Sequence, residues 1–248
     1  MMTITRLLGS VTLVMAGGLS LAAPVPKGGL PPAGVFVLDD CDPDFKGKAA
    51  YEDNLSAIGP SGKLVFRVSG VNGCESIGSN HIIANDPDRK RVWALEYAGK
   101  RICQYDHSGK KLLTVDDVQV SAAAVDPTTG NLWVLISKNG IKTGETIVLD
   151  SRGKKVATHP VNGWDIIYDP KGKAFWVAGR NLTKMSAKDG TVLSVQPIAT
   201  WCASSLDVHP TTGRVWVAIR KDDKVPGDEN IILQFDNDGT LLRTVELG

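Results

Sequence analysis

The sequence predicts an all-β fold, a β-propeller of about five four-stranded blades, and two recurring markers carry this prediction. An Asp-Pro or His-Pro turn returns after 40, 43 and 40 residues, and a tryptophan follows each turn at the same distance. Short apolar runs separated by turn residues, at a period of about 40 to 45 residues, are typical of propeller blades. The markers are Asp86-Pro87, Asp126-Pro127, Asp169-Pro170 and His209-Pro210, with Trp93, Trp133, Trp176 and Trp216.

Residues 122–161 show one complete unit. Strands are expected at residues 122–125, 132–136, 146–149 and 155–158, joined by turns at Gly130 and Gly153. The tryptophan strand should be the second strand, and its apolar pattern suits burial on both faces. The second strands of the five units are therefore expected at residues 35–38, 92–95, 132–136, 175–178 and 215–219, and each repeat tryptophan is expected to lie mostly between neighbouring sheets.

Three regions divide the chain: residues 1–22 as a signal peptide, 23–33 as a Pro/Gly-rich tether, and 34–248 as the propeller. Arg6 precedes an apolar run that ends at Ser20-Leu21-Ala22, a pattern typical of a cleaved secretory signal. A retained anchor is the alternative, but the run is short for a membrane span. The expected product is secreted or periplasmic, with no membrane span after cleavage.

Charge argues against one class of partner. The first 22 residues carry one of the 28 basic residues and none of the 27 acidic ones, so the remaining chain has no formal net charge. Nucleic-acid binding relies on clustered positive charge, and we expect no nucleic-acid partner.

The first unit is expected to be incomplete. Its innermost strand is not visible after residue 22, while the last unit ends with its own fourth strand near residues 241–247. The propeller is therefore expected to be open, or cut short from six blades. An unpaired strand edge would then permit edge-mediated self-association.

Four cysteines remain after the signal peptide, and an oxidising compartment would allow them to pair. Cys41 and Cys74 both fall in connections on one side of the first unit, so a Cys41–Cys74 disulfide is expected. The pairing of Cys103 and Cys202 stays open.

The segment IIANDPDRKRVWALEYAGKRICQYDHSGKKLLTV resembles an NHL-type repeat: a strand and Asp-Pro turn, an aromatic strand, a polar loop and a Gly-turn hairpin. Similar repeats form the gluconolactonase-like and streptogramin-lyase-like propellers. The resemblance implies a propeller, usually of six blades, and in the gluconolactonases a divalent metal in the central channel. The early glutamate of that metal site has no counterpart in AGVFVLDD.

Ligand-binding residues are expected where the innermost strands begin, because a propeller brings these starts together around its channel. The expected set combines polar groups with aromatic surface, as a small polar ligand requires. Asp165 is the expected metal contact, for calcium or magnesium, and His81 the expected proton carrier. A water-filled pore with self-satisfied side chains is the alternative. The set is Asn80, His81, Trp164, Asp165 and Ser205.

Two functions from different classes remain. The favoured one is an exported, non-catalytic binding module whose loop face holds a protein, a glycan or a small polar ligand. The alternative is a calcium- or magnesium-dependent hydrolase or lyase of the gluconolactonase or streptogramin-lyase type, in which the ion would polarise a carbonyl group.

Overall fold

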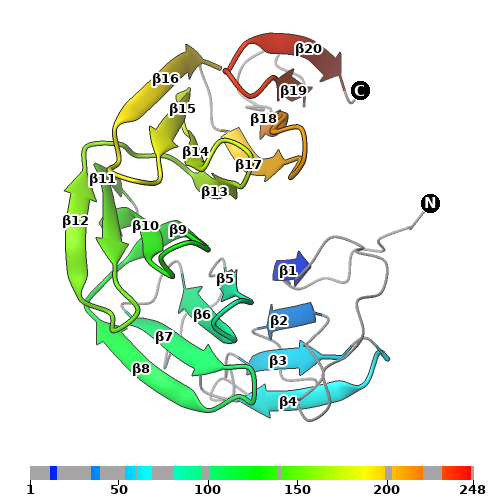
Figure 1. The fold of residues 1–248 in the computed structure, drawn as a ribbon, viewed down its shortest axis with the longest axis vertical. Helices are drawn as coiled ribbons and strands as arrows, with labels where there is room; N and C mark the ends of the chain where they lie inside the picture. Colours follow the sequence, from blue (N-terminus) through cyan, green and yellow to red (C-terminus); the bar gives the residue numbers. More distant parts are fainter. Residues whose placement is uncertain are drawn as a thin grey trace. The chain divides into compact units, whose positions relative to one another are not determined.

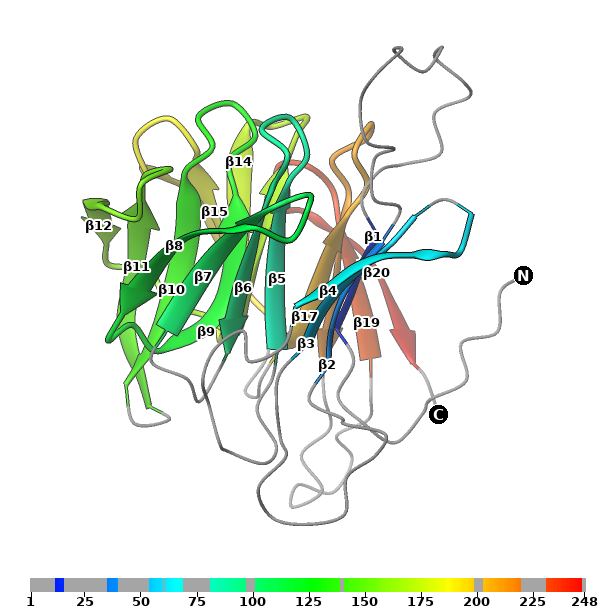
Figure 2. The same cartoon turned by 90° about the horizontal axis from the view of Figure 1, so that it is seen from below.

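The computed structural model describes residues 12–15, 35–39, 54–59, 61–68, 81–96, 101–138, 141–198, 203–219 and 231–246. These residues form strands, turns and irregular segments and no helix, so the all-β prediction is confirmed. The strands make five four-stranded antiparallel sheets in which consecutive strands are neighbours (Figures 1 and 2). The chain divides into two compact units, Met1–Gln119 and Val120–Gly248, and each is described by itself.

The first unit contains two sheets. The first sheet consists of β1 (Thr12–Met15), β2 (Val35–Asp39), β3 (Asn54–Ile58) and β4 (Leu64–Val68). The second sheet consists of β5 (His81–Asp86), β6 (Arg91–Glu96), β7 (Arg101–Asp106) and β8 (Lys111–Asp116). Phe36 and Leu55 of the first sheet pack against Val92 and Tyr105 of the second, which buries the apolar faces between them.

The first sheet corrects one expectation. It has four strands, because β1 pairs with β2 from Thr12 opposite Leu38 to Met15 opposite Val35. The innermost strand thus comes from residues that the sequence pattern assigns to a signal peptide, and it is reached by a long connection between β1 and β2. Signal peptides and innermost propeller strands can both consist of a short apolar run, so composition could not separate the two roles.

The second unit contains three sheets. Its first sheet holds β9 (Val120–Val125), β10 (Leu132–Lys138), β11 (Ile141–Leu149) and β12 (Lys155–His159). The middle sheet holds β13 (Asp165–Asp169), β14 (Ala174–Ala178), β15 (Asn181–Ser186) and β16 (Val192–Pro197). The last sheet holds β17 (Ala203–Val208), β18 (Val215–Ile219), β19 (Ile231–Phe235) and β20 (Leu241–Glu246). All five second strands fall where the sequence predicts them.

Within the second unit, the first two sheets each pack their tryptophan face against the next sheet along the chain. The innermost strand β13 contacts both β9 and β17. Trp133 of the first of these sheets lies 4.5 Å from Phe175 of the middle sheet, centroid to centroid, in a stacked pair. Trp176 of the middle sheet shares a core cluster with Val217 and Phe235 of the last sheet. The repeat tryptophan is therefore the contact between sheets.

The proline turns close through the side chain that precedes proline. In the first sheet of the second unit, Asp126 accepts hydrogen bonds from the Thr128 amide at 2.9 Å and the Thr129 hydroxyl at 2.6 Å. In the middle sheet, Asp169 accepts one from the Lys171 amide at 3.0 Å. The aspartates thus cap their own turns, as expected for Asx turns. In the last sheet, His209 Nδ1 takes this role and accepts bonds from two amides, at 3.3 and 3.2 Å.

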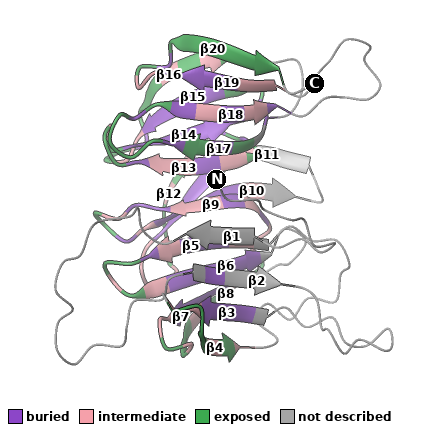
Figure 3. Ribbon diagram, turned by 90° about the vertical axis from the view of Figure 1, so that its right-hand side faces the viewer, coloured by how far each residue is buried: buried purple, intermediate pink, exposed green. Residues whose placement is uncertain are grey.

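Three of the four repeat tryptophans are buried as predicted, with Trp93 and Trp176 at 0% exposure and Trp133 at 3%. Trp216 departs from the prediction, because it is only partly buried and lines a cavity. It lies on the last sheet, whose outermost strand β20 is exposed along its whole length (Figure 3). Burial of this tryptophan depends on what covers the last sheet.

Candidate functional site

Two kinds of connection meet at one side of the middle sheet and enclose a cavity of about 710 Å³. We call it the loop cavity. One connection enters β13 and the other joins β14 to β15. A volume of this size lies within the range of small-molecule sites. Its lining consists of residues 160–164, 179–181, Thr183, Val192 and Val195.

Close backbone contact holds the two connections together. The Trp164 amide donates to the Ala178 carbonyl at 2.6 Å, and the Gly179 amide donates to the Asn181 carbonyl at 2.9 Å. A Cβ atom at Gly163 would lie 2.5 Å from the Ala178 carbonyl oxygen, so a larger residue would push the connections apart. Glycine at this position therefore fixes the shape of the cavity wall.

The cavity offers aromatic, amide and cationic groups together. Trp164 is 39% exposed, although its backbone amide is hydrogen-bonded to Ala178. Arg180, just before β15, and Asn181, its first residue, are exposed, as is Asn162 in the connection that enters β13. An indole face, amide groups and a guanidinium can stack on a ring, bond hydroxyl groups and hold a carboxylate.

Side chains at the starts of the innermost strands tie neighbouring sheets to each other. Ser121 Oγ donates to the Gly163 carbonyl at 3.5 Å, which links the start of β9 to the residues before β13. Asp165 Oδ2 accepts a bond from the Leu206 amide at 2.8 Å, and its Oδ1 accepts one from the Ile166 amide. The carboxylate of Asp165 thus joins β13 to β17, and a metal ion there would compete with two backbone donors.

The predicted ligand-facing residues are only partly brought together. Trp164 lines the loop cavity, Asp165 follows it at the first position of β13, and Ser205 is exposed on the neighbouring strand β17. His81 is the first residue of β5, in the other unit, and Asn80 lies outside the described residues. The roles of His81 as a proton carrier and of Asp165 as a metal contact stay predictions.

Other sequence predictions fall outside what can be described. Cys41, Cys74 and Cys202 lie beyond the described residues, so the Cys41–Cys74 disulfide stays a prediction. Cys103 is buried, with its Sγ 3.9 Å from the Thr114 hydroxyl. Among the residues that the structure describes, no three His, Cys, Asp or Glu side chains group as metal ligands would. The same residues include no helix that is long and apolar enough to span a bilayer.

Sequence reasoning missed part of the cavity wall. Asn162, Thr183, Val192 and Val195 lie on three different segments, and only the pairing of β15 with β16 brings the last three side by side. Arg180 carried a weak signal, since it stands in the short connection between the second and third strands of its unit. The pairing register of the hairpin, which the sequence does not reveal, decides which of its side chains reach the cavity.

Comparisons with known proteins agree on the fold. No protein-family model matches the chain, and no curated protein matches it by sequence. Among solved structures, Kuenenia stuttgartiensis hydrazine synthase matches with a TM-score of 0.62 at 14% identity, over 88% of this chain and 64% of that one. A Bacteroides caccae protein of unknown function matches with a TM-score of 0.58 at 12% identity, over 90% and 84% of the two chains.

Raptor from Chaetomium thermophilum also matches, with a TM-score of 0.61 at 12% identity, over 86% of this chain and 19% of that one. This chain therefore spans less than two thirds of the hydrazine synthase chain and a fifth of Raptor. Identities this low carry the fold and nothing about activity. The five four-stranded sheets and these matches place the chain in the β-propeller fold class.

Proposed function

We propose that this protein is an exported β-propeller that works as a non-catalytic binding module through its loop face. The observation that carries the proposal is the loop cavity, in which the exposed Trp164 stands beside Arg180 and Asn181. Binding needs only such complementary surface, whereas catalysis needs a positioned acid, base, nucleophile or metal as well. The NHL-like repeats support the same interpretation, because their recurring residues cap the turns and pack the sheets together. These are structural roles and not catalytic ones.

A glycan suits the loop cavity better than the other two expected partners. The indole of Trp164 offers a flat apolar face for a sugar ring, and the Asn162 and Asn181 amides can bond its hydroxyl groups. The guanidinium of Arg180 can hold a carboxylate in two-point geometry. We therefore propose an acidic oligosaccharide as the ligand class.

Binding of oligosaccharides by calorimetry tests this proposal. Tetragalacturonate and the uncharged cellotetraose serve as probes, with the intact chain compared to Trp164→Ala, Arg180→Gln and the matched control Lys155→Gln, at an exposed residue of β12. Trp164→Ala should weaken tetragalacturonate at least about tenfold, and Arg180→Gln should weaken it without affecting any binding of cellotetraose. Failure of both sugars to bind the intact chain, or equal binding by all variants, would overturn the proposal.

Export has its own test, because the proposed signal peptide contains β1. Cleavage after Ala22 would remove β1 and leave the inner edge of β2 without its partner strand. The intact mass of the protein recovered from outside the cytoplasm distinguishes the two cases. Loss of residues 1–22 is expected for export, and retention of Met1 or Met2 would contradict cleavage.

The alternative, a calcium- or magnesium-dependent hydrolase or lyase, remains open as a class, and no specific observation among the described residues favours it. The proposed metal contact Asp165 already accepts backbone hydrogen bonds at both oxygens. Metal analysis of the purified protein, with the melting temperature measured with and without calcium, addresses this alternative. A stoichiometric ion and a calcium-dependent rise in melting temperature would favour it.

A further inference from the structure

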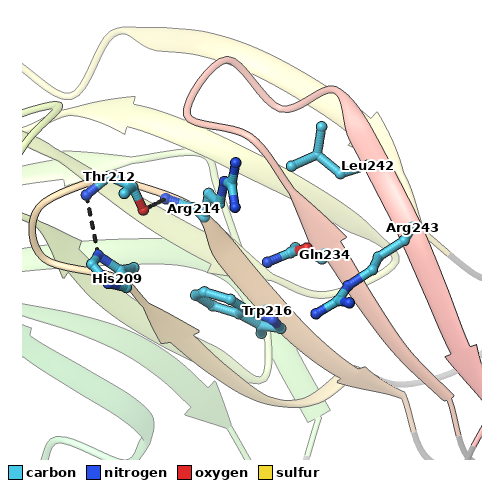
Figure 4. A pocket seen from close by; sticks show the side chains of 7 residues that line it. All are labelled: His209, Thr212, Arg214, Trp216, Gln234, Leu242 and Arg243. Atoms are coloured by element: carbon cyan, nitrogen blue, oxygen red, sulfur yellow. Dashed lines mark hydrogen bonds between the residues drawn. The ribbon is translucent and has the colours of Figure 1, made fainter.

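The last sheet of the second unit carries a second cavity, of about 540 Å³, on its tryptophan face. It shares no lining residue with the loop cavity. Figure 4 shows Arg214 and Arg243 on either side of Gln234, with the Trp216 indole next to them and Leu242 on the same strand as Arg243. We call this surface the arginine face. Its lining residues are His209, Thr212, Arg214, Trp216, Gln234, Leu242 and Arg243.

Strand register shows how this face differs from the two other sheets of its unit. Residues directly opposite each other in an antiparallel sheet share a face, so each tryptophan defines a row across its sheet. In the first two sheets the row ends on β12 and β16 with small residues, Ala157 and Ser194. In the last sheet it ends on β20 with Arg243. A small residue at this position leaves space for the turn of a following sheet to pack there. An arginine occupies that space with a charged side chain.

The turn before Trp216 also carries different charged residues from the matching turns before Trp133 and Trp176. At the position of Arg214, the other two sheets of the unit carry Asn131 and Ala174. The turn aspartates Asp126 and Asp169 are replaced by His209, and the buried Lys184 is replaced by the uncharged Gln234. The last sheet therefore gains two surface cations where its neighbours have none, and it loses the turn carboxylate that could balance them.

The positive charge of the arginine face has no counterpart in the cavity lining. No acidic residue is among the described residues that line the cavity, and in the described part of the chain neither Arg214 nor Arg243 forms a salt bridge. Asp207 lies opposite Trp216 in the same row, but it is not part of the lining and its Oδ1 accepts a bond from the Val208 amide. The cavity thus pairs two exposed guanidinium groups with indole and aliphatic surface.

We propose that the arginine face binds an acidic peptide segment in which an apolar side chain alternates with carboxylates. The apolar side chain would lie against Trp216 and Leu242, and the carboxylates would meet Arg214 and Arg243 in charge-assisted hydrogen bonds. Arginine and tryptophan are also the residue types that most often dominate peptide and protein interfaces. An extended segment suits a face bounded by the exposed strand β20, whose edge can add a strand.

The charge also decides against a second copy of this chain as the occupant. In such a dimer, the turn between the last two strands of the second copy's first sheet would cover the arginine face. Elsewhere in the chain, the matching turn covers the aromatic row of the preceding sheet. Gly109, for example, lies against Phe66, and Gly239 lies against Trp176. In the first sheet that turn carries Lys63, whose charge would meet two arginines. Like charges in direct contact oppose association.

Fluorescence anisotropy with three labelled hexapeptides tests the proposal. The probes alternate leucine with glutamate, glutamine or lysine, and inorganic triphosphate is added as a competitor. The glutamate peptide should bind best, and its affinity should fall as salt rises. Arg214→Gln and Arg243→Gln should each weaken it about tenfold, while the control Lys155→Gln should not.

Several outcomes would overturn the proposal. These are equal binding of the three peptides, equal binding by the Arg214→Gln/Arg243→Gln double variant, or no binding to the intact chain. Triphosphate that displaces the peptide at the peptide's own affinity would assign the face to phosphate instead. A dimer that sedimentation detects and Arg243→Gln dissolves would assign it to a second copy. Equal melting temperatures for intact and variant chains would show that lost affinity is not lost folding.

Discussion

The middle sheet, β13–β16, and the last sheet, β17–β20, are built on the same repeat and differ in what their tryptophan faces contact. Trp176 is fully buried, and Trp216 at the same repeat position is partly exposed beside a cavity. The polar side chains next to Trp176 form hydrogen bonds and an ion pair with one another, whereas Trp216 lies beside two exposed arginines. The comparison shows that the repeat fixes the strand and the turn, while the residues around the tryptophan fix whether the face is a core or a surface.

The polar group of the middle sheet explains how charge is tolerated in its core. Lys184 Nζ lies 3.5 Å from Asp169 Oδ2, and it donates to the side-chain oxygen of Asn237 at 3.1 Å and to the Asn237 backbone carbonyl. Asn237 Nδ2 donates to Asp169 Oδ2 at 2.6 Å. Asp169 is 0% exposed and Lys184 7% exposed, so both charges depend on these partners. The group also connects the middle sheet to the last one.

The largest predicted effect comes from removing each tryptophan in turn. Trp176→Ala should lower the free energy of unfolding by about 3 to 5 kcal/mol, because it leaves a cavity inside a core cluster. Trp216→Ala should cost about half as much, because its face is already in contact with solvent. Urea denaturation measures both. Equal costs would mean that the two faces are covered alike, contrary to the comparison.

Removing one member of the buried ion pair should have the next largest effect. Lys184→Met should lower the free energy of unfolding by about 3 kcal/mol, because the Asp169 carboxylate would stay buried without its cation. Gln234→Met, at the matched position opposite Trp216, should cost about 1 kcal/mol or less. Chemical denaturation of the two variants side by side makes the measurement. A larger loss for Gln234→Met would contradict the assignment of Lys184 to a core network.

A pH effect should arise in the first sheet of the second unit. The His159 ring stacks on Trp133 at 5.0 Å, and burial lowers the pKa of His159 below its ordinary value of 6.5. The unfolded chain then binds the proton more readily, so the stability that His159 contributes is complete above pH 6.5 and is lost as the pH falls below it. His107 is shifted in the same direction, also by burial.

Melting temperatures at pH 5 and pH 7.5 measure this effect. The intact chain should melt at a lower temperature at pH 5, and His159→Gln should reduce the difference between the two values. A difference unchanged by His159→Gln would contradict a lowered pKa for the half-buried His159.

The sequence was sufficient for the repeat architecture because the signals are local. Asp126-Pro127 and Trp133 lie within one turn and strand, so periodicity places them without knowledge of contacts. The innermost strand of the first sheet was missed because β1 comes from an apolar run before a long connection. Partial exposure of Trp216 was missed because its sequence, RVWVA, is nearly that of the covered strands. Burial of that side chain is set by a neighbouring sheet that its own segment does not encode.

The candidate sites show the same limit. Trp164 could be predicted, because an aromatic residue stands at the start of an innermost strand. Its neighbours in the loop cavity could not, since Gly163, Arg180 and Val195 meet only through hairpin register and close backbone contact. The arginine face could be recognised only after the register aligned Arg243 with Ser194 and Ala157 across three sheets.

The most direct test of the comparison is the solvent exposure of single tryptophans in solution. Fluorine NMR of protein labelled with 5-fluorotryptophan, with each resonance assigned by a Trp→Phe variant, gives one signal for each indole. On transfer from H₂O to D₂O, the Trp216 resonance should show a clear solvent isotope shift, and those of Trp93, Trp133 and Trp176 should show almost none. A Trp216 resonance as insensitive to solvent as that of Trp176 would show that the last sheet is covered and would contradict the account.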